Sequence, residues 1–430
     1  MSIKIEPVST LLLERARLVD PRLKLDKVAD ILIEKDRIKE IGSIPNFKGR
    51  TIDCTDKIVM PGLVDMHVHL REPGQEHKET IKTGCNAAAA GGFTEICCMP
   101  NTKPPVDSRG GVEFIRERAA GHLVEVHPIA AVTMNLDGEK LTEMADMIEA
   151  GAVGFSDDGR PVSTAGLMRR ALEYAGMFGR PIIDHCEDPT LSGGGVMHEG
   201  FVSTALGMPA IPSVAEEVIV ARDVLMAEYT GGSLHIAHVS TAGSVRIIRD
   251  AKKRGVHITA ETCPHYLVLS DDAVRSFDPF TKMNPPLRSM DDQKALLAGL
   301  KDGTIDTIAT DHAPHAIEDK ECEFLSAAFG IVGLETALGL IWTYLVGKKI
   351  LNLEQVIDKM AIQPRKILGL SGHLIEPGAV ANLTLFDPEM QWQVDSAIFE
   401  SKSKNTPFQG WKLKGRSLGV INRGKLSQHH

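Results

Sequence analysis

Two histidines stand two positions apart in the run Val64-Asp65-Met66-His67-Val68-His69-Leu70-Arg71. The apolar run 58–64, which contains a Pro-Gly turn, indicates a strand that leads into this pair. Because side chains along a strand alternate between its two faces, His67 and His69 point to the same side. Two imidazoles on one face can bind a divalent metal ion, but many such pairs are exposed or hydrogen-bonded in a core. Residues elsewhere in the chain must therefore distinguish a metal site from exposed or hydrogen-bonded histidines.

Further potential metal ligands lie at the ends of four other predicted strands. They are Asp157-Asp158 after 152–156, His185 at the end of 181–185 with Glu187 nearby, His238 at the end of 233–238, and Asp311 after 305–310. Imidazoles and carboxylates are ligands suited to Zn²⁺, or to Mn²⁺ or Co²⁺ in its place. Four histidines and two carboxylates exceed one tetrahedral site. We therefore expect a two-metal centre bridged by a carboxylate and a hydroxide.

The middle of the chain alternates apolar, strand-like runs with helical patterns. This alternation is typical of an α/β fold, the closed parallel (β/α)8 TIM-type barrel, whose catalytic groups sit at the C-terminal ends of the strands. An open doubly wound sheet is the alternative, but no Gly-rich phosphate fingerprint follows the first strand. The expected strands are 62–69, 92–98, 123–132, 152–156, 181–185, 233–238, 256–262 and 305–310. The expected helices include 108–120, 142–150, 164–178, 213–228, 242–254 and 290–300.

Both flanks of the chain contain short alternating runs with turn signals, which predict strands. Neither flank is large enough to stand alone, so we expect them to pair into one small composite β-sandwich domain. The expected organisation is 1–60 as the N-terminal part of this β domain, 61–365 as the metal-binding barrel, and 366–430 as the C-terminal part.

The composition excludes several classes of protein. The 430 residues carry a formal net charge of -9, which argues against binding to nucleic acid or to an anionic membrane. The N-terminus lacks the pattern of a signal peptide, and no apolar run is long enough to span a bilayer. Seven cysteines, an odd number scattered through apolar segments, fit reduced thiols in a cytoplasmic protein. The sequence leaves open whether the terminal pair His429-His430 is native.

Long ordered motifs resemble those of the amidohydrolase superfamily, and within it the bacterial type I dihydroorotases. The resemblance covers nearly the whole chain. The motifs are Pro61–Gly74, Met99–Thr102, Phe155–Gly159, Glu261–Tyr266, Lys282–Arg288 and Thr310–His315. It implies the reversible cyclisation of N-carbamoyl-L-aspartate to L-dihydroorotate and water, the third step of de novo pyrimidine synthesis.

The fourth strand separates this family from its relatives. Hydantoinases, dihydropyrimidinases and allantoinases place a carboxylated lysine there as the metal bridge, whereas this chain has no lysine between Lys140 and Lys252. Type I dihydroorotases carry an aspartate bridge, and the register of the motif implies Asp158. Asp157 is the adjacent alternative, because strand alternation alone cannot choose between the two.

The resemblance also assigns roles to individual residues. Asp311 would be both a metal ligand and the general acid/base, and two ions, zinc by the family pattern, would lower the pKa of a shared water. Arg71, on the same strand face as the two histidines, offers a bidentate fork to a substrate carboxylate. The implied substrate contacts are His69, Arg71, Asn101, Asn284, His315, Phe329 and Gly330. His265 is interpreted as a supporting or structural residue.

The polar segment 313–329 is long for a barrel loop and could act as a lid. The resemblance leaves open a homodimer and a complex with aspartate transcarbamoylase. Two other functions stay in view. One is a different cyclic-amide hydrolase, and the other is a non-catalytic partner of aspartate transcarbamoylase, against which the complete set of ligands argues.

Overall fold

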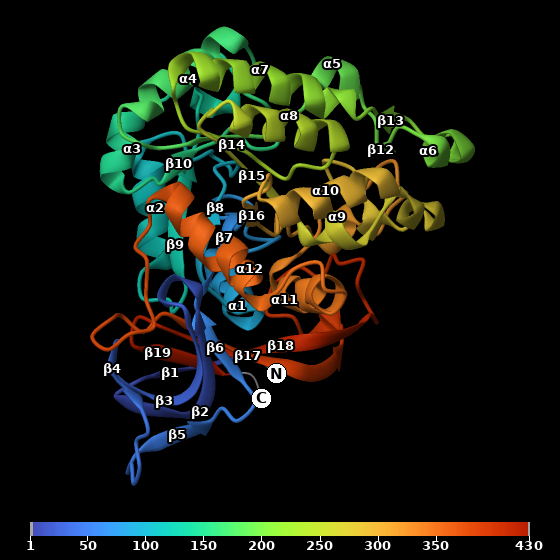
Figure 1. Ribbon diagram of the computed structural model, residues 1–430. Coiled ribbons are helices and arrows are strands. Elements are labelled where there is room, and N and C mark those ends of the chain that lie inside the picture. The colour runs from blue at the N-terminus through green and yellow to red at the C-terminus, as the bar shows by residue number, and fades with distance from the viewer. Residues whose placement is uncertain (1–2, 429–430) are drawn as a thin grey trace.

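The computed structural model describes residues 3–428; the terminal His429-His430 pair lies outside the described residues. Eight parallel strands surrounded by helices make up the upper part of Figure 1, and a second, nine-stranded sheet lies below them. Within residues 3–428, no helix has both the length and the apolar character needed to cross a membrane.

The eight-stranded sheet is a barrel, as predicted. Each strand falls within a predicted run but is shorter, because the residues at the strand ends belong to the loops. In chain order the strands are β7 (Leu63–Val68), β8 (Phe93–Cys98), β9 (Glu125–Ala130), β10 (Gly154–Phe155), β11 (Ile182–Asp184), β14 (Leu234–Ile236), β15 (Ile258–Thr262) and β16 (Thr307–Ile308). A bridge between Val68 and His312 joins the two outermost strands at their C-terminal ends, where the His69 amide donates to the His312 carbonyl at 2.8 Å.

Helices surround the barrel. The six predicted ones are confirmed as α2 (Arg109–Ala119), α3 (Met144–Ala150), α4 (Ala165–Gly176), α7 (Val214–Thr230), α8 (Ala242–Lys253) and α10 (Met290–Asp302). The patterns did not single out α1 (Ile81–Gly91) or the short helices α5 (Pro189–Ser192), α6 (Phe201–Leu206), α9 (Pro264–Val268), α11 (Leu334–Leu340), α12 (Leu353–Ile357) and α13 (Gln363–Leu368).

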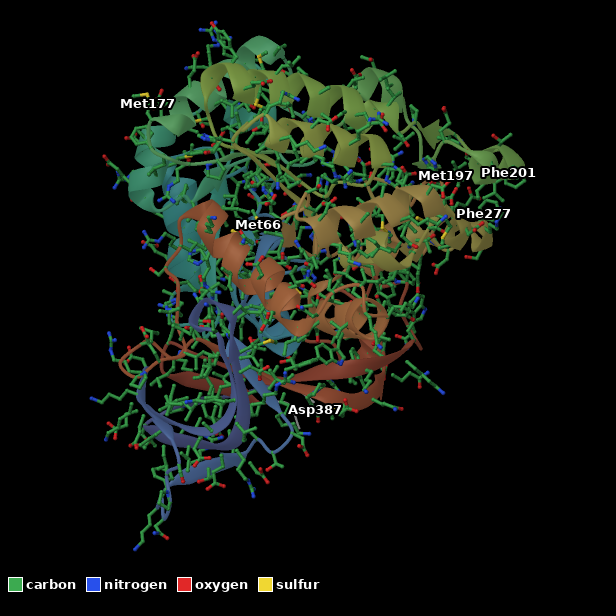
Figure 2. The ribbon with its side chains drawn as sticks, viewed as in Figure 1. Met66, Met177, Met197, Phe201, Phe277 and Asp387 are labelled. Carbon is green, nitrogen blue, oxygen red and sulfur yellow. The ribbon has the colours of Figure 1, made fainter. Side chains whose placement is uncertain are left out.

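An excursion between β11 and α7 contains α5, α6 and the paired strands β12 (Met197–His198) and β13 (Ala210–Ile211). Its tip carries Phe201, which is 81% exposed and lies close to Phe277 in the view of Figure 2. The glycine run 193–195 lies in a turn between α5 and β12.

The nine-stranded sheet is built from both flanks of the chain, as expected. Its strands form one continuous hydrogen-bonded sheet around an apolar cluster that includes Leu13, Ile33 and Leu385. Its order is β1 (Lys4–Pro7), β19 (Lys425–Gln428), β18 (Lys412–Asn422), β17 (Leu383–Gln393), β6 (Ile58–Pro61), β2 (Thr10–Asp20), β3 (Leu25–Glu34) and β4 (Arg37–Gly42), with β5 (Arg50–Asp53) paired to β2.

The run 58–64, which we interpreted as one strand, is divided at Gly62. Residues before it pair in the nine-stranded sheet, and residues after it begin the barrel. A Cβ atom at Gly62 would lie 2.0 Å from Asn382 Oδ1 and 2.2 Å from Thr94 Oγ1. The chain can therefore pass between the two sheets here only with a residue that has no side chain.

A buried ion pair fastens α13 to the other end of the barrel, away from the strand C-termini. Arg365 donates to Glu95 Oε1 on β8 at 2.6 Å and to the carbonyls of Gly62 and Ala361 at 2.8 Å each. The Asn382 amide donates to the same Glu95 oxygen at 3.0 Å. Burial raises the pKa of Glu95, but Arg365 and His127 outweigh it and hold the pKa at about 2.

Replacing Arg365 by leucine should destabilise the fold by about 3–5 kcal/mol, because Glu95 would remain buried without its main partner. The loss of stability should shrink as the pH falls from about 4.5 towards 2, where Glu95 becomes protonated in both the folded and unfolded states. The measurement is the denaturant midpoint at several pH values. The control is Arg254→Leu, which removes an exposed ion pair with Glu228 and should cost less than about 1 kcal/mol. Equal losses in the two variants would contradict the assignment.

Candidate metal centre

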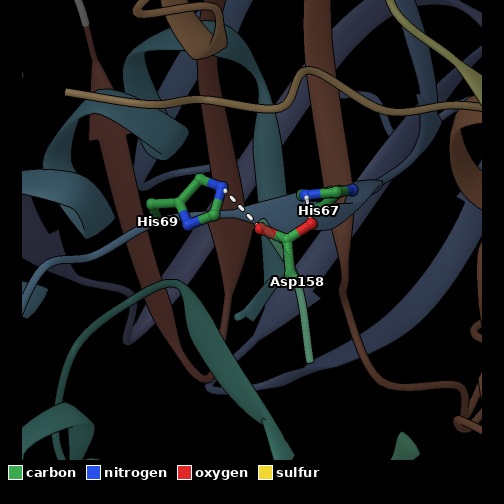
Figure 3. A group of neighbouring side chains, drawn as sticks. All are labelled: His67, His69 and Asp158. Atoms are coloured by element: carbon green, nitrogen blue, oxygen red, sulfur yellow. Dashed lines mark ion pairs between the residues drawn. The ribbon is translucent and has the colours of Figure 1, made fainter. Parts of the chain in front are cut away.

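The six expected ligands meet at the C-terminal ends of the barrel strands. Five of them form two groups that share Asp158, one with His67 and His69 and the other with His185 and His238. The sixth, Asp311, lies beside the first group. In each group the potential ligand atoms lie within 4.8 Å of one another. Figure 3 shows the Asp158 carboxylate directed at both histidines of the first group. Residues that the sequence placed at strand ends, up to 244 positions apart, therefore lie close together in the structure.

Asp158 lies between the two pairs of imidazoles. Its Oδ1 is 3.3 Å from His67 Nε2, 3.8 Å from His238 Nε2 and 3.9 Å from His185 Nδ1, and its Oδ2 is 3.5 Å from His69 Nε2. Two ligands on one tetrahedral zinc ion are separated by roughly 3.3 Å, given metal–ligand bonds of about 2 Å. These spacings therefore suit a carboxylate shared by two ions.

Asp157 is engaged elsewhere. Its Oδ1 accepts hydrogen bonds from the amides of Val132 and Thr133 at 2.9 Å each, and its Oδ2 accepts one from Thr133 Oγ1 at 2.5 Å. These bonds tie the end of β10 to the loop after β9. The geometry thus favours Asp158 as the bridging residue over its neighbour.

Asp311 completes the first group. Its Oδ1 lies 3.1 Å from His69 Nε2 and 3.6 Å from His67 Nε2. Burial raises the pKa of Asp311, but the imidazoles of His67 and His69 outweigh burial and hold it at about 2. The carboxylate is therefore ionised, and it can accept a proton or bind a cation.

Several polar atoms in this cluster are buried without a hydrogen-bond partner among the described residues, including His67 Nε2 and Asp158 Oδ1. Buried polar groups are normally paired, since an unpaired one costs about 1–3 kcal/mol. Both atoms point into the cluster, where a cation would pair with them. The donor set of imidazoles and carboxylates fits divalent zinc.

Three further residues fix which imidazole nitrogen faces the centre. His67 Nδ1 donates to Glu261 at 2.6 Å, His69 Nδ1 to Asn101 at 2.9 Å, and His185 Nε2 to Glu187 at 3.3 Å. In each case the opposite ring nitrogen faces the cluster, where it can bind an ion once the ring is neutral. Glu261 lies near the end of β15, inside a motif whose resemblance implied no role for it.

Three residues at this rim have a left-handed backbone conformation. Arg71, His238 and Asp311 have φ values of 60°, 32° and 48°, in the left-handed region that residues with side chains rarely adopt. Such conformations cost about 1–3 kcal/mol each and persist where the surroundings enforce them. The three residues lie just beyond the ends of β7, β14 and β16, where the strands give way to loops.

Arg71 lies buried at the same rim. Its Nε donates to the Pro314 carbonyl at 3.1 Å, and its terminal nitrogen lies 3.5 Å from His315 Nε2. The same His315 nitrogen lies 2.8 Å from the Phe329 carbonyl. Burial and the neighbouring cations Arg71 and Lys78 lower the pKa of His315 to about 3, so the ring is neutral and donates to that carbonyl. Arg71 is thus next to the segment 313–329.

Three further residues were predicted to contact substrate, and the structure shows what each of them touches. Asn101 Nδ2 donates to the carbonyl oxygen and to Oδ2 of Asp158 at 3.2 Å each, so its amide orients two potential ligands. Asn284 Nδ2 donates to Glu187 at 2.6 Å, while its buried Oδ1 has no partner among the described residues. Gly330 has φ of 121°, and a Cβ there would lie 2.6 Å from Ala313 Cβ.

The other histidines are supporting or peripheral. His265 is buried with its ring 4.2 Å from the ring of Tyr266, and its Nε2 has no partner among the described residues. His235 lies in none of the matched motifs, but its Nε2 lies 3.3 Å from Glu261, the same carboxylate that holds His67. His127 pairs with Glu95 at the opposite end of the barrel.

Comparisons with known proteins agree with this geometry. The family model described as Dihydro-orotase-like matches residues 56–244. The dihydroorotase of Pelotomaculum thermopropionicum is 54% identical over 417 residues, which cover 97% of this chain and 98% of that protein. The dihydroorotase of Syntrophus aciditrophicus is 53% identical over 421 residues, with the same coverage.

Among solved structures, the L-hydantoinase (dihydropyrimidinase) of Arthrobacter aurescens superposes with a TM-score of 0.86 at 28% identity, over 97% of this chain and 95% of that one. The dihydropyrimidinase of Brevibacillus agri superposes with a TM-score of 0.82 over 96% and 94% of the two chains. Its 23% identity supports the shared fold alone.

The neighbouring aspartates give a matched test of the centre. Asp158→Asn should lower the metal content of the purified protein by at least one ion per chain, because the bridging charge is lost. Asp157→Asn should keep the metal and lower the free energy of unfolding by about 1–3 kcal/mol, through weaker hydrogen bonds to residues 132–133. Elemental analysis and thermal melting measure the two effects. The opposite pattern would assign the bridge to Asp157.

Proposed function

We propose that this chain, which belongs to the dihydroorotase family, catalyses the reversible cyclisation of N-carbamoyl-L-aspartate to L-dihydroorotate and water. This is the third step of de novo pyrimidine synthesis. The observation that supports it most strongly is the combination at one rim of an aspartate between two histidine pairs with a buried arginine. The first feature suits amide hydrolysis, and the second suits a substrate that carries a carboxylate.

His67, His69 and Asp311 would hold one divalent ion, His185 and His238 a second, and Asp158 both. Zinc suits these ligands best, and Mn²⁺ or Co²⁺ could replace it. When bound, a pair of such ions supplies Lewis acidity and lowers the pKa of a coordinated water towards neutrality. Glu261, Asn101 and Glu187 keep the ligating nitrogens directed at the ions.

Asp311 is proposed as the general acid/base. In the hydrolytic direction it accepts the proton of the attacking water and delivers it to the amide nitrogen as the ring carbon–nitrogen bond breaks. In the synthetic direction it removes a proton from the carbamoyl nitrogen, which bonds to the carbon of the side-chain carboxyl while water leaves. The low pKa of its carboxyl makes the ionised form available for this step at neutral pH.

The substrate would be held from two sides. Arg71 would bind the carboxylate that both substrates carry, assisted by His315 and Asn101. Asn284 would contact the pyrimidine ring through its unpaired Oδ1, which can accept a hydrogen bond from a ring N–H. The backbone of Phe329 and Gly330 would contact the ring beside it, while His69 borders both metal and substrate.

Assembly with aspartate transcarbamoylase or into a homodimer, and a cytoplasmic location, remain part of this proposal. The residues at the rim provide no reason to require a partner for the chemistry, since all six proposed ligands come from one chain.

The reaction can be tested with the purified protein and carbamoyl-aspartate at mildly acidic pH, with dihydroorotate formation followed by its ultraviolet absorbance. Turnover should be abolished by a zinc chelator and restored by added Zn²⁺, because bound ions would supply the Lewis acidity that the reaction needs. Turnover of hydantoin or dihydrouracil in preference to dihydroorotate would reassign the chain to another cyclic-amide hydrolysis. Absence of any chelator-sensitive turnover would favour the non-catalytic role.

The role of Arg71 can be tested by comparing two ring substrates. Arg71→Met should lower kcat/KM for dihydroorotate by about 10–100-fold, since a hydrogen bond to a charged group contributes roughly 1.5–3 kcal/mol. Dihydrouracil lacks the carboxylate, so its slow hydrolysis should change much less. If kcat/KM fell equally for both substrates, Arg71 would stabilise the structure of the rim and would not bind the substrate carboxylate.

A further inference from the structure

The segment 313–329 lies packed against the barrel rim, and two lysines hold it there. Lys320, within this segment, is 1% exposed and has no carboxylate within ion-pairing distance among the described residues. Its ammonium instead donates to the carbonyl of Lys282 at 3.2 Å and to the carbonyl of Ala328 at 2.7 Å. A buried ammonium without an acidic partner is uncommon, because its charge is costly to remove from water.

Lys282 makes the complementary contact from the opposite loop. Its ammonium donates to the Leu325 carbonyl at 2.8 Å and lies 4.6 Å from the centre of the Phe329 ring. Its own carbonyl accepts from Lys320 and, at 3.0 Å, from the amide of Gly330. Each lysine thus reaches across to the backbone of the segment that carries the other.

The two segments joined in this way carry the proposed ring contacts. Asn284 lies two residues after Lys282, and Phe329-Gly330 follows directly on Ala328. The base of segment 313–329 is fixed separately by Asn405, whose Nδ2 donates to the carbonyls of Ala313 and Gly330 at 3.0 and 3.1 Å. The lysines therefore fix the middle of the segment, and with it the distance between the two sides of the substrate site.

We propose that Lys282 and Lys320 form a reciprocal clasp that positions Asn284 opposite the Phe329–Gly330 backbone and thereby determines affinity for the pyrimidine ring. The substrate named in this inference rests on the proposed function. Neither lysine touches the potential metal ligands, so both act as positioning residues. Binding should depend on the clasp much more than the chemical step does.

The charge of Lys320 gives the clasp a pH dependence. Burial and the neighbouring Lys282 lower the pKa of Lys320 to about 7, against weaker opposing effects of Asp278, Cys322 and Asp319. Below this pH the ammonium holds both carbonyls. Above it the amine has lost one N–H and its charge, and the hydrogen bonds weaken.

The main test uses Lys320→Met, Lys282→Met, the double variant and the control Lys301→Met, which removes an exposed lysine on α10. Each clasp variant should raise KM for L-dihydroorotate about 5–20-fold with kcat within about 3-fold and metal content unchanged. The double variant should be no worse than the poorer single variant, because both lysines support the same spacing. An unchanged KM, multiplying effects, or a parallel fall in kcat and metal content would overturn the proposal.

A second measurement covers the case in which the methionine variants fold poorly. In Lys320→Arg the side chain stays charged, so its KM should stay flat between pH 6 and 8.5 relative to wild type, whose KM should rise as Lys320 loses its proton. Identical pH profiles for the two proteins would overturn the clasp.

A third measurement needs no substrate. Chymotrypsin should cleave the holoenzyme within 313–329 at least about 5-fold faster in Lys320→Met than in wild type, with Leu325 and its neighbours as the cleavage sites. An unchanged cleavage rate would overturn the clasp. Failure of wild type to turn over dihydroorotate would instead overturn the proposed function, while the cleavage rates would still decide whether the lysines hold the segment.

Discussion

The arrangement at the barrel rim depends on how the charge of one buried carboxylate is balanced. Asp158 is 6% exposed, and no hydrogen bond from a described residue reaches its Oδ1. A carboxylate in such a place must face positive charge or become protonated. Without a cation, the surrounding imidazoles provide the balance. Burial lowers the pKa of His67, but Glu261 and Asp158 outweigh burial and raise it well above its ordinary value. Divalent cations would provide the same balance and leave the imidazoles neutral.

The need to balance this charge explains the residues that hydrogen-bond to the proposed ligands. Glu261 holds His67 and His235, Asn101 spans His69 and Asp158, and Glu187 links His185 to Asn284. Each contact fixes the ring or amide that faces the centre. The last of them also connects a metal-facing histidine to a residue proposed to contact substrate. Under the proposed function, one carboxylate therefore contacts both a metal ligand and a substrate contact.

The sequence was most informative where residue type and strand position coincide. His67, His69, His185, His238 and Asp311 follow apolar runs, and the barrel alternation places the ends of those runs together. The choice between Asp157 and Asp158 needed the family register, because two adjacent aspartates at a strand end look alike by alternation. The division at Gly62 was missed because an apolar run continues through it. Glu261, Glu187, Lys320 and Asn405 could not be assigned, since their partners come from other strands or loops and depend on side-chain packing.

The pairing of Lys4 with Gln428 has a consequence for how the molecule is made. The strands β1 and β19 are neighbours although 424 positions separate these residues, and β6 beside the barrel pairs with β17 from the other flank. Contacts between distant parts of a chain form slowly because a long loop must close first. During synthesis, the early strands therefore expose unpaired edges while several hundred later residues are still being added. Chaperone protection of the nascent hairpin β2–β3 would matter more for the yield of this protein than for one whose neighbouring strands follow each other in order.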